Sequence, residues 1–180
     1  KSFIIEINND IEELYSLIID DSTQIKAMNK LILFDPIKDL NENGQLTNEM
    51  GQAVNRLAYL NTFTSQNTTF QSLVSSGKLD VIKGFDIKME LLDHYHNNLN
   101  TLSEVEQYYR KSFDNNILPF AVKNFSELGS NPEKVLNTRG FDTMIQVHNS
   151  LLQQRNQAIR SCRKSALKLK EHLNQLLINN

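Results

Sequence analysis

The chain has 180 residues, of which 39% are hydrophobic, and a formal net charge of -2 at pH 7. This length is enough to bury a hydrophobic core, and we expect one domain that spans residues 1–180. The slight negative charge argues against a nucleic-acid-binding domain, because such domains are usually basic. Cys162 is the only cysteine, which excludes an intrachain disulfide, and we expect it to be buried as a small apolar residue.

The first 33 residues carry apolar side chains at alternating steps of three and four. This spacing predicts an amphipathic helix with coiled-coil-like packing. The helix should end near Phe34, because the residue before Pro36 disfavours helix. The pattern is already established at Lys1 without a preceding N-cap residue, so we expect it to continue from an upstream segment. Its apolar positions are Ile4, Ile7, Ile11, Leu14, Ile18, Ile25, Met28 and Ile32.

A loop and a second helix follow. Residues 39–47 combine asparagine and glycine and predict a loop, whereas residues 48–62 predict a helix. Residues 62–67 are polar and predict a break.

The next segment contains a dense set of helix-boundary signals. Thr68 or Thr69 can cap a short helix, and Gly77 is a suitable left-handed terminator for it. Asp80 can cap one further turn, which Gly84 ends.

A long helix is predicted from Asp86, its cap, to about Leu118. Pro119 should disrupt or kink it. Residues 120–140 predict an irregular connector, with a short helix starting at Pro132, because proline is favoured at the first helical position.

The last predicted helix begins at Asp142, after Gly140. Gly84-Phe85-Asp86 and Gly140-Phe141-Asp142 look alike. They represent either two independent uses of good boundary residues or a weak duplication of a two-helix unit. The helix keeps the three-and-four spacing through Ile145, His148, Leu152, Arg155, Ile159, Cys162, Ala166, Leu169, Leu173 and Leu176.

These elements predict an all-α fold, an up-down antiparallel bundle of long helices with short helical connectors. The first helix is predominantly acidic and the last predominantly basic, which favours their pairing.

Three polar residues interrupt the apolar positions of the long helices: Asp21, His148 and Arg155. An antiparallel alignment of the first and last helices places Arg155 one turn from the position opposite Asp21. We therefore expect a buried or half-buried Asp21–Arg155 pair that sets helix register. The alternatives are an anion- or amino-acid-binding spot, or side chains that extend outward to solvent. We expect Arg155→Leu to be tolerated and Asp21→Ala to destabilise the fold.

No catalytic, metal or cofactor site is predicted. His94 and His96 are two positions apart on a helix and cannot chelate one metal ion, so we assign them to a solvated helix surface. Ser75-Ser76-Gly77-Lys78 lacks the first glycine and the leading strand of a phosphate-binding loop. The sequence therefore favours a protein that is not an enzyme.

Two segments resemble an uncharacterised family of Bacteroidota membrane proteins: TTFQSLVSSGKLDVIK (Thr68–Lys83) and NILPF (Asn116–Phe120). The resemblance covers nearly the whole chain, and its central phrase is moderately specific. Members of that family have one transmembrane helix, with a short basic N-terminus before it and an all-helical extracytoplasmic domain after it. The resemblance implies a single-pass inner-membrane protein that lacks its N-terminal anchor here, with this domain facing the periplasm. It implies no activity and no site residues.

Two functions remain open. The first is a membrane-anchored domain that binds a protein partner, forms a homo-oligomer or scaffolds an envelope complex. The second is a ligand-sensing input domain that binds a small molecule between helices.

Overall fold

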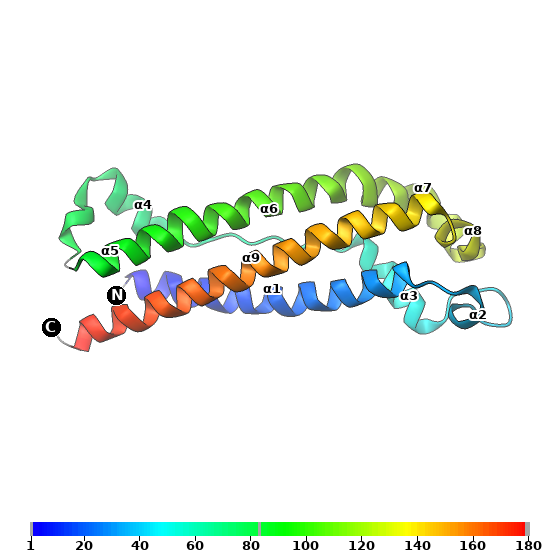
Figure 1. Ribbon diagram of the computed structural model, residues 1–180, viewed down its shortest axis with the longest axis horizontal. Helices are drawn as coiled ribbons and strands as arrows, with labels where there is room; N and C mark the ends of the chain where they lie inside the picture. The colour runs from blue at the N-terminus through cyan, green and yellow to red at the C-terminus, as the bar shows by residue number, and fades with distance from the viewer. Residues whose placement is uncertain (1, 83, 179–180) are drawn as a thin grey trace. The chain divides into compact units, whose positions relative to one another are not determined.

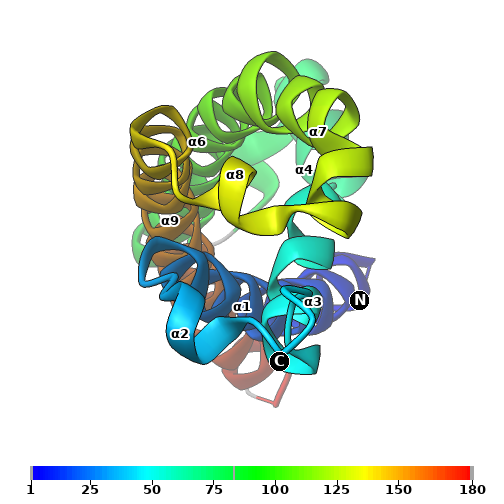
Figure 2. The same ribbon diagram turned by 90° about the vertical axis from the view of Figure 1, so that its right-hand side faces the viewer.

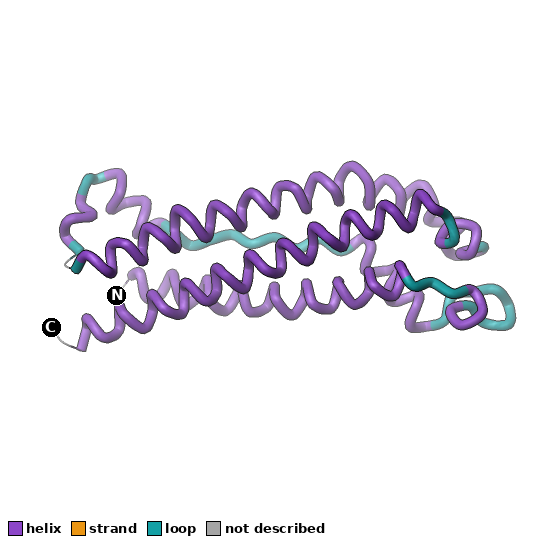
Figure 3. Tube along the Cα trace, viewed as in Figure 1, coloured by secondary structure: helices purple, strands orange, loops and turns teal. Residues whose placement is uncertain are grey.

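The computed structural model describes residues 2–82 and 84–178, which form an all-α helical bundle (Figures 1 and 3). Lys1 and Lys83, which belong to the segments discussed above, lie outside the described residues. The α-helices are α1 (Ser2–Ile32), α2 (Pro36–Asp39), α3 (Asn48–Asn55), α4 (Thr68–Ser75), α5 (Phe85–Leu92), α6 (Leu99–Ser112), α7 (Leu118–Ser130), α8 (Pro132–Leu136) and α9 (Arg139–Ile178). Two 3-10 turns, η1 (Arg56–Ala58) and η2 (Lys78–Val81), and two π-helical turns, η3 (Asp93–Asn98) and η4 (Phe113–Ile117), adjoin them.

The chain divides into two compact units. Unit 1 comprises Lys1–Ile19, Thr62–Val105 and Asn156–Asn180, and unit 2 comprises Asp20–Asn61 and Glu106–Arg155. Helices α1, α6 and α9 each contribute residues to both units. Neither unit is therefore a contiguous piece of the chain.

Unit 1 has its own apolar core, to which α1, α4, α5, η3, α6 and α9 contribute. Asn156 on α9 donates to the carbonyl of Ile18 on α1 (3.4 Å), and the buried Cys162 donates to the carbonyl of Asn98 (3.0 Å). The core residues are Ile7, Ile11, Leu14, Leu17, Phe70, Ile87, Leu91, Tyr95, Leu99, Leu102, Ile159, Cys162, Ala166 and Leu169. The burial predicted for Cys162 is confirmed.

Unit 2 has a separate core, which includes residues of α3, η1, η4, α7 and α8 as well as the long helices. Figure 2 looks onto the end of this unit, where α8 follows α7 and where α2 and α3 follow α1. Asn149 on α9 donates to Asn29 on α1 (2.8 Å). The core residues of unit 2 are Met28, Leu31, Met50, Ala53, Leu57, Tyr109, Phe113, Ile117, Leu128, Val135, Leu136, Phe141, Ile145 and Leu152.

In each unit α9 runs antiparallel to α1: Arg163 and Asn156 contact Tyr15 and Ile18 in unit 1, and Arg155 and Asn149 contact Asp21 and Asn29 in unit 2. The chain returns from η1 to α4 through residues 59–67, which are drawn as loop in Figure 3. Acidic residues of α1 accept hydrogen bonds from this segment and from Thr69 at the start of α4, interactions that the sequence did not predict. In unit 1 the pairs are Glu6 with Thr69, Asp10 with Ser65 and Gln66, and Glu13 with Thr64.

The predicted helix boundaries are correct at one glycine and wrong at two aspartates. Gly77 follows α4 with a φ of +67°, the left-handed conformation that glycine tolerates. Gly84 (φ +107°) is the N-cap residue of α5, so Asp86 lies inside the first turn and is not the cap. Gly140 and Asp142 lie within the first turn of α9.

Thr138, rather than Asp142, caps α9, because its Oγ1 accepts a hydrogen bond from the Phe141 amide (3.2 Å). The expected caps at Thr68 or Thr69 and at Asp80 are wrong as well. Asn67 is the N-cap residue of α4 and makes no side-chain cap hydrogen bond, and Asp80 lies within η2. The Glu6 carboxylate instead accepts the Thr69 amide (3.1 Å).

The irregular connector predicted for residues 120–140 is also wrong, because α7 continues to Ser130. Pro119 sits in the first turn of α7, directly after the π turn η4. Proline lacks the backbone N–H, which a residue in the first turn of a helix does not need. The π turn before it also replaces the regular α-helical hydrogen bonds that a proline would break. The short helix at Pro132 is confirmed as α8, and the second helix ends early, at Asn55.

Candidate functional site

A buried arginine holds together three helices of unit 2. Arg155 is 1% exposed, and its Nη1 contacts Oδ1 of Asp21. Its Nη2 and Nε lie 3.1 and 3.2 Å from Oε1 of Glu106. Nη2 also donates to the carbonyl of Asn61 (2.8 Å), and the Tyr109 ring centroid lies 5.2 Å from Cζ. The structure thus brings Asp21 and Arg155 together, as the sequence predicts, and adds Glu106.

This cluster places two carboxylates against one guanidinium. Burial raises the pKa of Asp21 to about 6, Arg155 opposes the rise, and Glu106 adds to it. Every nitrogen of the guanidinium has a protein acceptor, so the cluster has no donor nitrogen reserved for a ligand. We therefore interpret it as a group that fixes helix register rather than as a binding spot.

The same cluster holds residues 59–61 in place. Tyr109 donates its hydroxyl to Oε1 of Gln24 (3.2 Å), and Nε2 of Gln24 donates to the carbonyl of Tyr59 (3.0 Å). Oδ2 of Asp20 accepts from the Tyr59 hydroxyl (3.2 Å) and from Nδ2 of Asn61 (3.1 Å). Side chains of α1, together with Arg155 of α9, therefore fix the extended backbone that follows η1.

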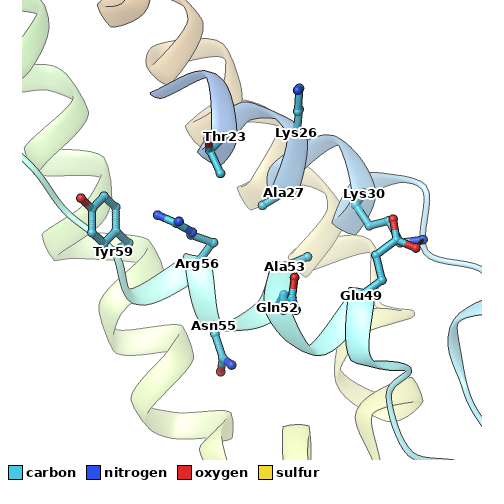
Figure 4. Close-up of a pocket in the computed structure, with 10 residues that line it drawn as sticks. All are labelled: Thr23, Lys26, Ala27, Lys30, Glu49, Gln52, Ala53, Asn55, Arg56 and Tyr59. Carbon is cyan, nitrogen blue, oxygen red and sulfur yellow. Dashed lines mark hydrogen bonds and ion pairs between the residues drawn. The ribbon is translucent and has the colours of Figure 1, made fainter. Parts of the chain in front are cut away.

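A groove of about 670 Å³ lies beside this segment, between α1 and the stretch formed by α3 and η1. Figure 4 shows Arg56 and Tyr59 at one end of it and Lys30 and Glu49 at the other. Cζ of Arg56 lies 5.0 Å from the Tyr59 ring centroid, and Nζ of Lys30 lies 3.2 Å from Oε2 of Glu49. We call this the Arg56 groove. Its other lining residues are Thr23, Lys26, Ala27, Gln52, Ala53 and Asn55.

His148, the third polar interruption, is fully buried in unit 2. Its ring stacks on Tyr109 with the centroids 4.8 Å apart, and its Nδ1 lies 3.1 Å from Oγ of Ser112. Its Nε2 is buried and has no hydrogen-bond partner within residues 2–82 and 84–178. Burial lowers the pKa of His148 to about 4, so the imidazole is neutral at pH 7. His148 therefore behaves as a core residue.

Unit 1 contains two buried titratable residues that sequence reasoning missed. The assignment of His94 to a solvated surface is wrong: its side chain is fully buried in η3, and neither ring nitrogen has a partner among the described residues. Burial lowers its pKa to about 4. Asp10 accepts hydrogen bonds from the Gln66 amide (2.8 Å) and the Ser65 hydroxyl (3.0 Å), and burial raises its pKa to about 6.

Within the described ranges, no group of three or more His, Cys, Asp or Glu side chains is arranged to hold a metal ion. The same residues contain no helix that is both long and apolar enough to cross a membrane.

A second groove, of about 360 Å³, lies in unit 2 between the stretch formed by α3 and η1 and the helix α7, and has mainly apolar walls. Phe125, which lines it, is 81% exposed, and Val122 one turn earlier on α7 is 70% exposed. We call this groove together with these two residues the Phe125 face. The other lining residues are Leu46, Gly51, Val54, Asn55, Leu57, Ala58, Ala121, Leu128 and Gly129.

Comparison with known proteins adds no family: no family model, curated protein or solved structure matches this chain.

Proposed function

We propose that this chain is a non-enzymatic, membrane-anchored extracytoplasmic domain that binds a protein partner through the Phe125 face. The observation that carries the proposal is the exposure of Phe125 and Val122 beside an apolar groove. Exposed apolar patches next to a groove are typical of protein-interaction sites.

The groove suits an amphipathic helix of the partner. It lies between two helical segments, and Gly51 and Gly129 leave open space where a side chain would otherwise stand. Small residues let a second helix approach closely, while Phe125 and Val122 offer apolar contacts to its buried side. The strongly perturbed titratable groups, such as Asp21 and His148, are buried in the cores, which supports a structural rather than a catalytic use of them.

Site-specific photo-crosslinking in cells that express the full native chain tests this proposal. A photoreactive phenylalanine analogue at position 125 should give a discrete crosslinked product. The same analogue at Tyr108, an aromatic residue of unit 2 that is 62% exposed, should not. If neither position, or both equally, gave a product, the Phe125 face would not be the interaction surface.

The membrane anchor and the periplasmic location rest on the resemblance of Thr68–Lys83 and Asn116–Phe120 to the Bacteroidota family. Protease treatment of intact cells and of spheroplasts tests them. Cleavage only in spheroplasts, with the protein in the membrane fraction, is expected. A protein protected in both preparations would contradict this part of the proposal.

The ligand-sensing function is the second candidate, because the Arg56 groove has the size of a small-molecule site.

A further inference from the structure

The Arg56 groove has an apolar floor and three cationic side chains. Two of them, Arg56 and Lys26, form no ion pair with a described carboxylate. Lys30 is paired with Asp39 (3.1 Å) and with Glu49 (3.2 Å). Arg56 and Lys26 form no ion pair with the described residues, and the aromatic ring of Tyr59 is the contact that holds Arg56. Two cationic side chains at one groove therefore have no anionic partner in the described part of the chain.

The position of Arg56 favours an anionic ligand. Arg56 is half-buried as a residue, and its guanidinium lies toward the Tyr59 ring in Figure 4, so the ring holds the side chain while its N–H groups keep their hydrogen-bonding capacity. Guanidinium binds carboxylate and phosphate groups through paired N–H donors. Lys26 stands at the rim of the groove and adds positive charge.

The rest of the groove suits the body of a small organic molecule. Ala27 and Ala53 lie between the charged ends and offer an apolar floor, while Thr23, Gln52 and Asn55 supply polar side chains around it. The volume of about 670 Å³ is typical of small-molecule sites. We propose that the Arg56 groove binds a small organic anion, which places its carboxylate or phosphate group at Arg56 and its apolar body over Ala27 and Ala53.

A ligand in the groove would act on residues that contact the buried cluster of Arg155, Asp21 and Glu106. Tyr59 forms the end wall beside Arg56, and its carbonyl and hydroxyl are bound by Gln24 and Asp20. Asn61, two residues further on, accepts from Arg155. A ligand that immobilises Arg56 and Tyr59 therefore restricts residues 56–61. This inference deepens the ligand-sensing candidate and does not depend on the Phe125 face.

Titration calorimetry of the full chain with naphthyl phosphate tests the proposal. Inorganic phosphate and naphthol serve as the anionic and the apolar half of this probe. We expect naphthyl phosphate to bind more tightly than either half, and added salt to weaken it. Arg56→Gln should weaken binding about tenfold or more, because it removes a charge-assisted contact. Lys26→Gln should weaken it less.

Arg110→Gln is the matched control, because Arg110 is a 63% exposed arginine of the same unit and lies outside the groove. It should leave binding within about twofold of wild type. Phe125→Ala should also leave binding unchanged, which separates this site from the Phe125 face. Absence of binding, equal binding of naphthol, or binding that Phe125→Ala abolishes and Arg56→Gln does not, would overturn the proposal.

Amide hydrogen exchange gives a second readout that does not rely on affinity. With naphthyl phosphate bound, amides of residues 56–61 should exchange more slowly, and Arg56→Gln should remove this protection. Binding without any protection of these residues would place the probe elsewhere and overturn the assignment to this groove.

Discussion

Arg155 is the residue on which the polar interior of unit 2 depends. Asp21, Glu106 and the carbonyl of Asn61 all accept hydrogen bonds from its guanidinium. Without it, the carboxylates of Asp21 and Glu106 would lose the guanidinium that both contact, and the Asn61 carbonyl would lose the hydrogen bond from Nη2. Removal of one partner from such a buried cluster is costly, because the charge that remains is no longer compensated.

We therefore expect Arg155→Leu to lower the free energy of unfolding by about 3–5 kcal/mol. This reverses the expectation from the sequence, in which Asp21 was the one partner of Arg155. Asp21→Ala should cost less, about 2 kcal/mol, because Arg155 keeps Glu106 as a partner. Urea unfolding at pH 7 measures both, with the exposed Arg110→Leu as control. An Arg155→Leu variant as stable as wild type would show that the cluster does not stabilise the fold.

Buried histidines and buried aspartates should give the stability of the chain opposing dependences on pH. His94 and His148 have pKa values lowered to about 4. Between pH 4 and 6.5 the unfolded chain therefore binds protons at these sites and the folded chain does not, so stability rises with pH. The pKa values of Asp10 and Asp21 are raised to about 6, so between pH 4 and 6 these two residues bind protons in the folded chain and not in the unfolded one. Their contribution to stability therefore falls as pH rises.

His94→Leu isolates one of these contributions. Relative to wild type, this variant should gain roughly 3 kcal/mol in unfolding free energy when the pH is lowered from 7 to 4.5, because about 1.4 kcal/mol accompanies each pH unit of differential protonation. Chemical denaturation at the two pH values measures the change. His96→Leu is the control, because His96 is exposed two residues away. If His94→Leu showed the same difference from wild type at both pH values, His94 would not be buried in its neutral form.

At the level of secondary structure, periodicity predicts the long helices and misses the turns that join them. The three-and-four spacing gives α1 and α9 to within a few residues, and their antiparallel alignment is enough to pair Asp21 with Arg155. Glu106 carries no such signal, because it is one of several charged residues on a long helix. Its partner could be known only from the packing of α6 against α9.

The π turns explain two further errors. In η3, His94 and Tyr95 are both buried, although successive residues of a regular α-helix point about 100° apart. In η4, the widened turn precedes Pro119 and lets helical structure continue as α7. Neither turn has a distinctive residue pattern. The path of residues 59–67 was likewise not predictable, because carboxylates distant in sequence, such as Glu13 and Asp20, hold it.

At the scale of the whole molecule, the two units have separate apolar cores although three helices contribute to both. Leu14 belongs to the core of unit 1 and Leu152 to that of unit 2, and both are fully buried. If one unit opened alone, α1, α6 and α9 would each be broken at the boundary between the units. The backbone N–H and C=O groups at these new helix ends would lose their hydrogen-bond partners. The separate cores favour independent opening, whereas the continuous helices oppose it.

We expect the separate cores to dominate, because each buries its own set of large apolar side chains. Leu14→Ala and Leu152→Ala should each cost about 2–5 kcal/mol, since both create a cavity. In native-state hydrogen exchange, Leu14→Ala should accelerate mainly the amides of unit 1, such as those of α5, and Leu152→Ala mainly those of unit 2, such as those of α7. The two variants carry the same substitution at fully buried sites, so each is the control for the other. Equal acceleration throughout the chain in both would mean that the continuous helices make the two units one cooperative structure.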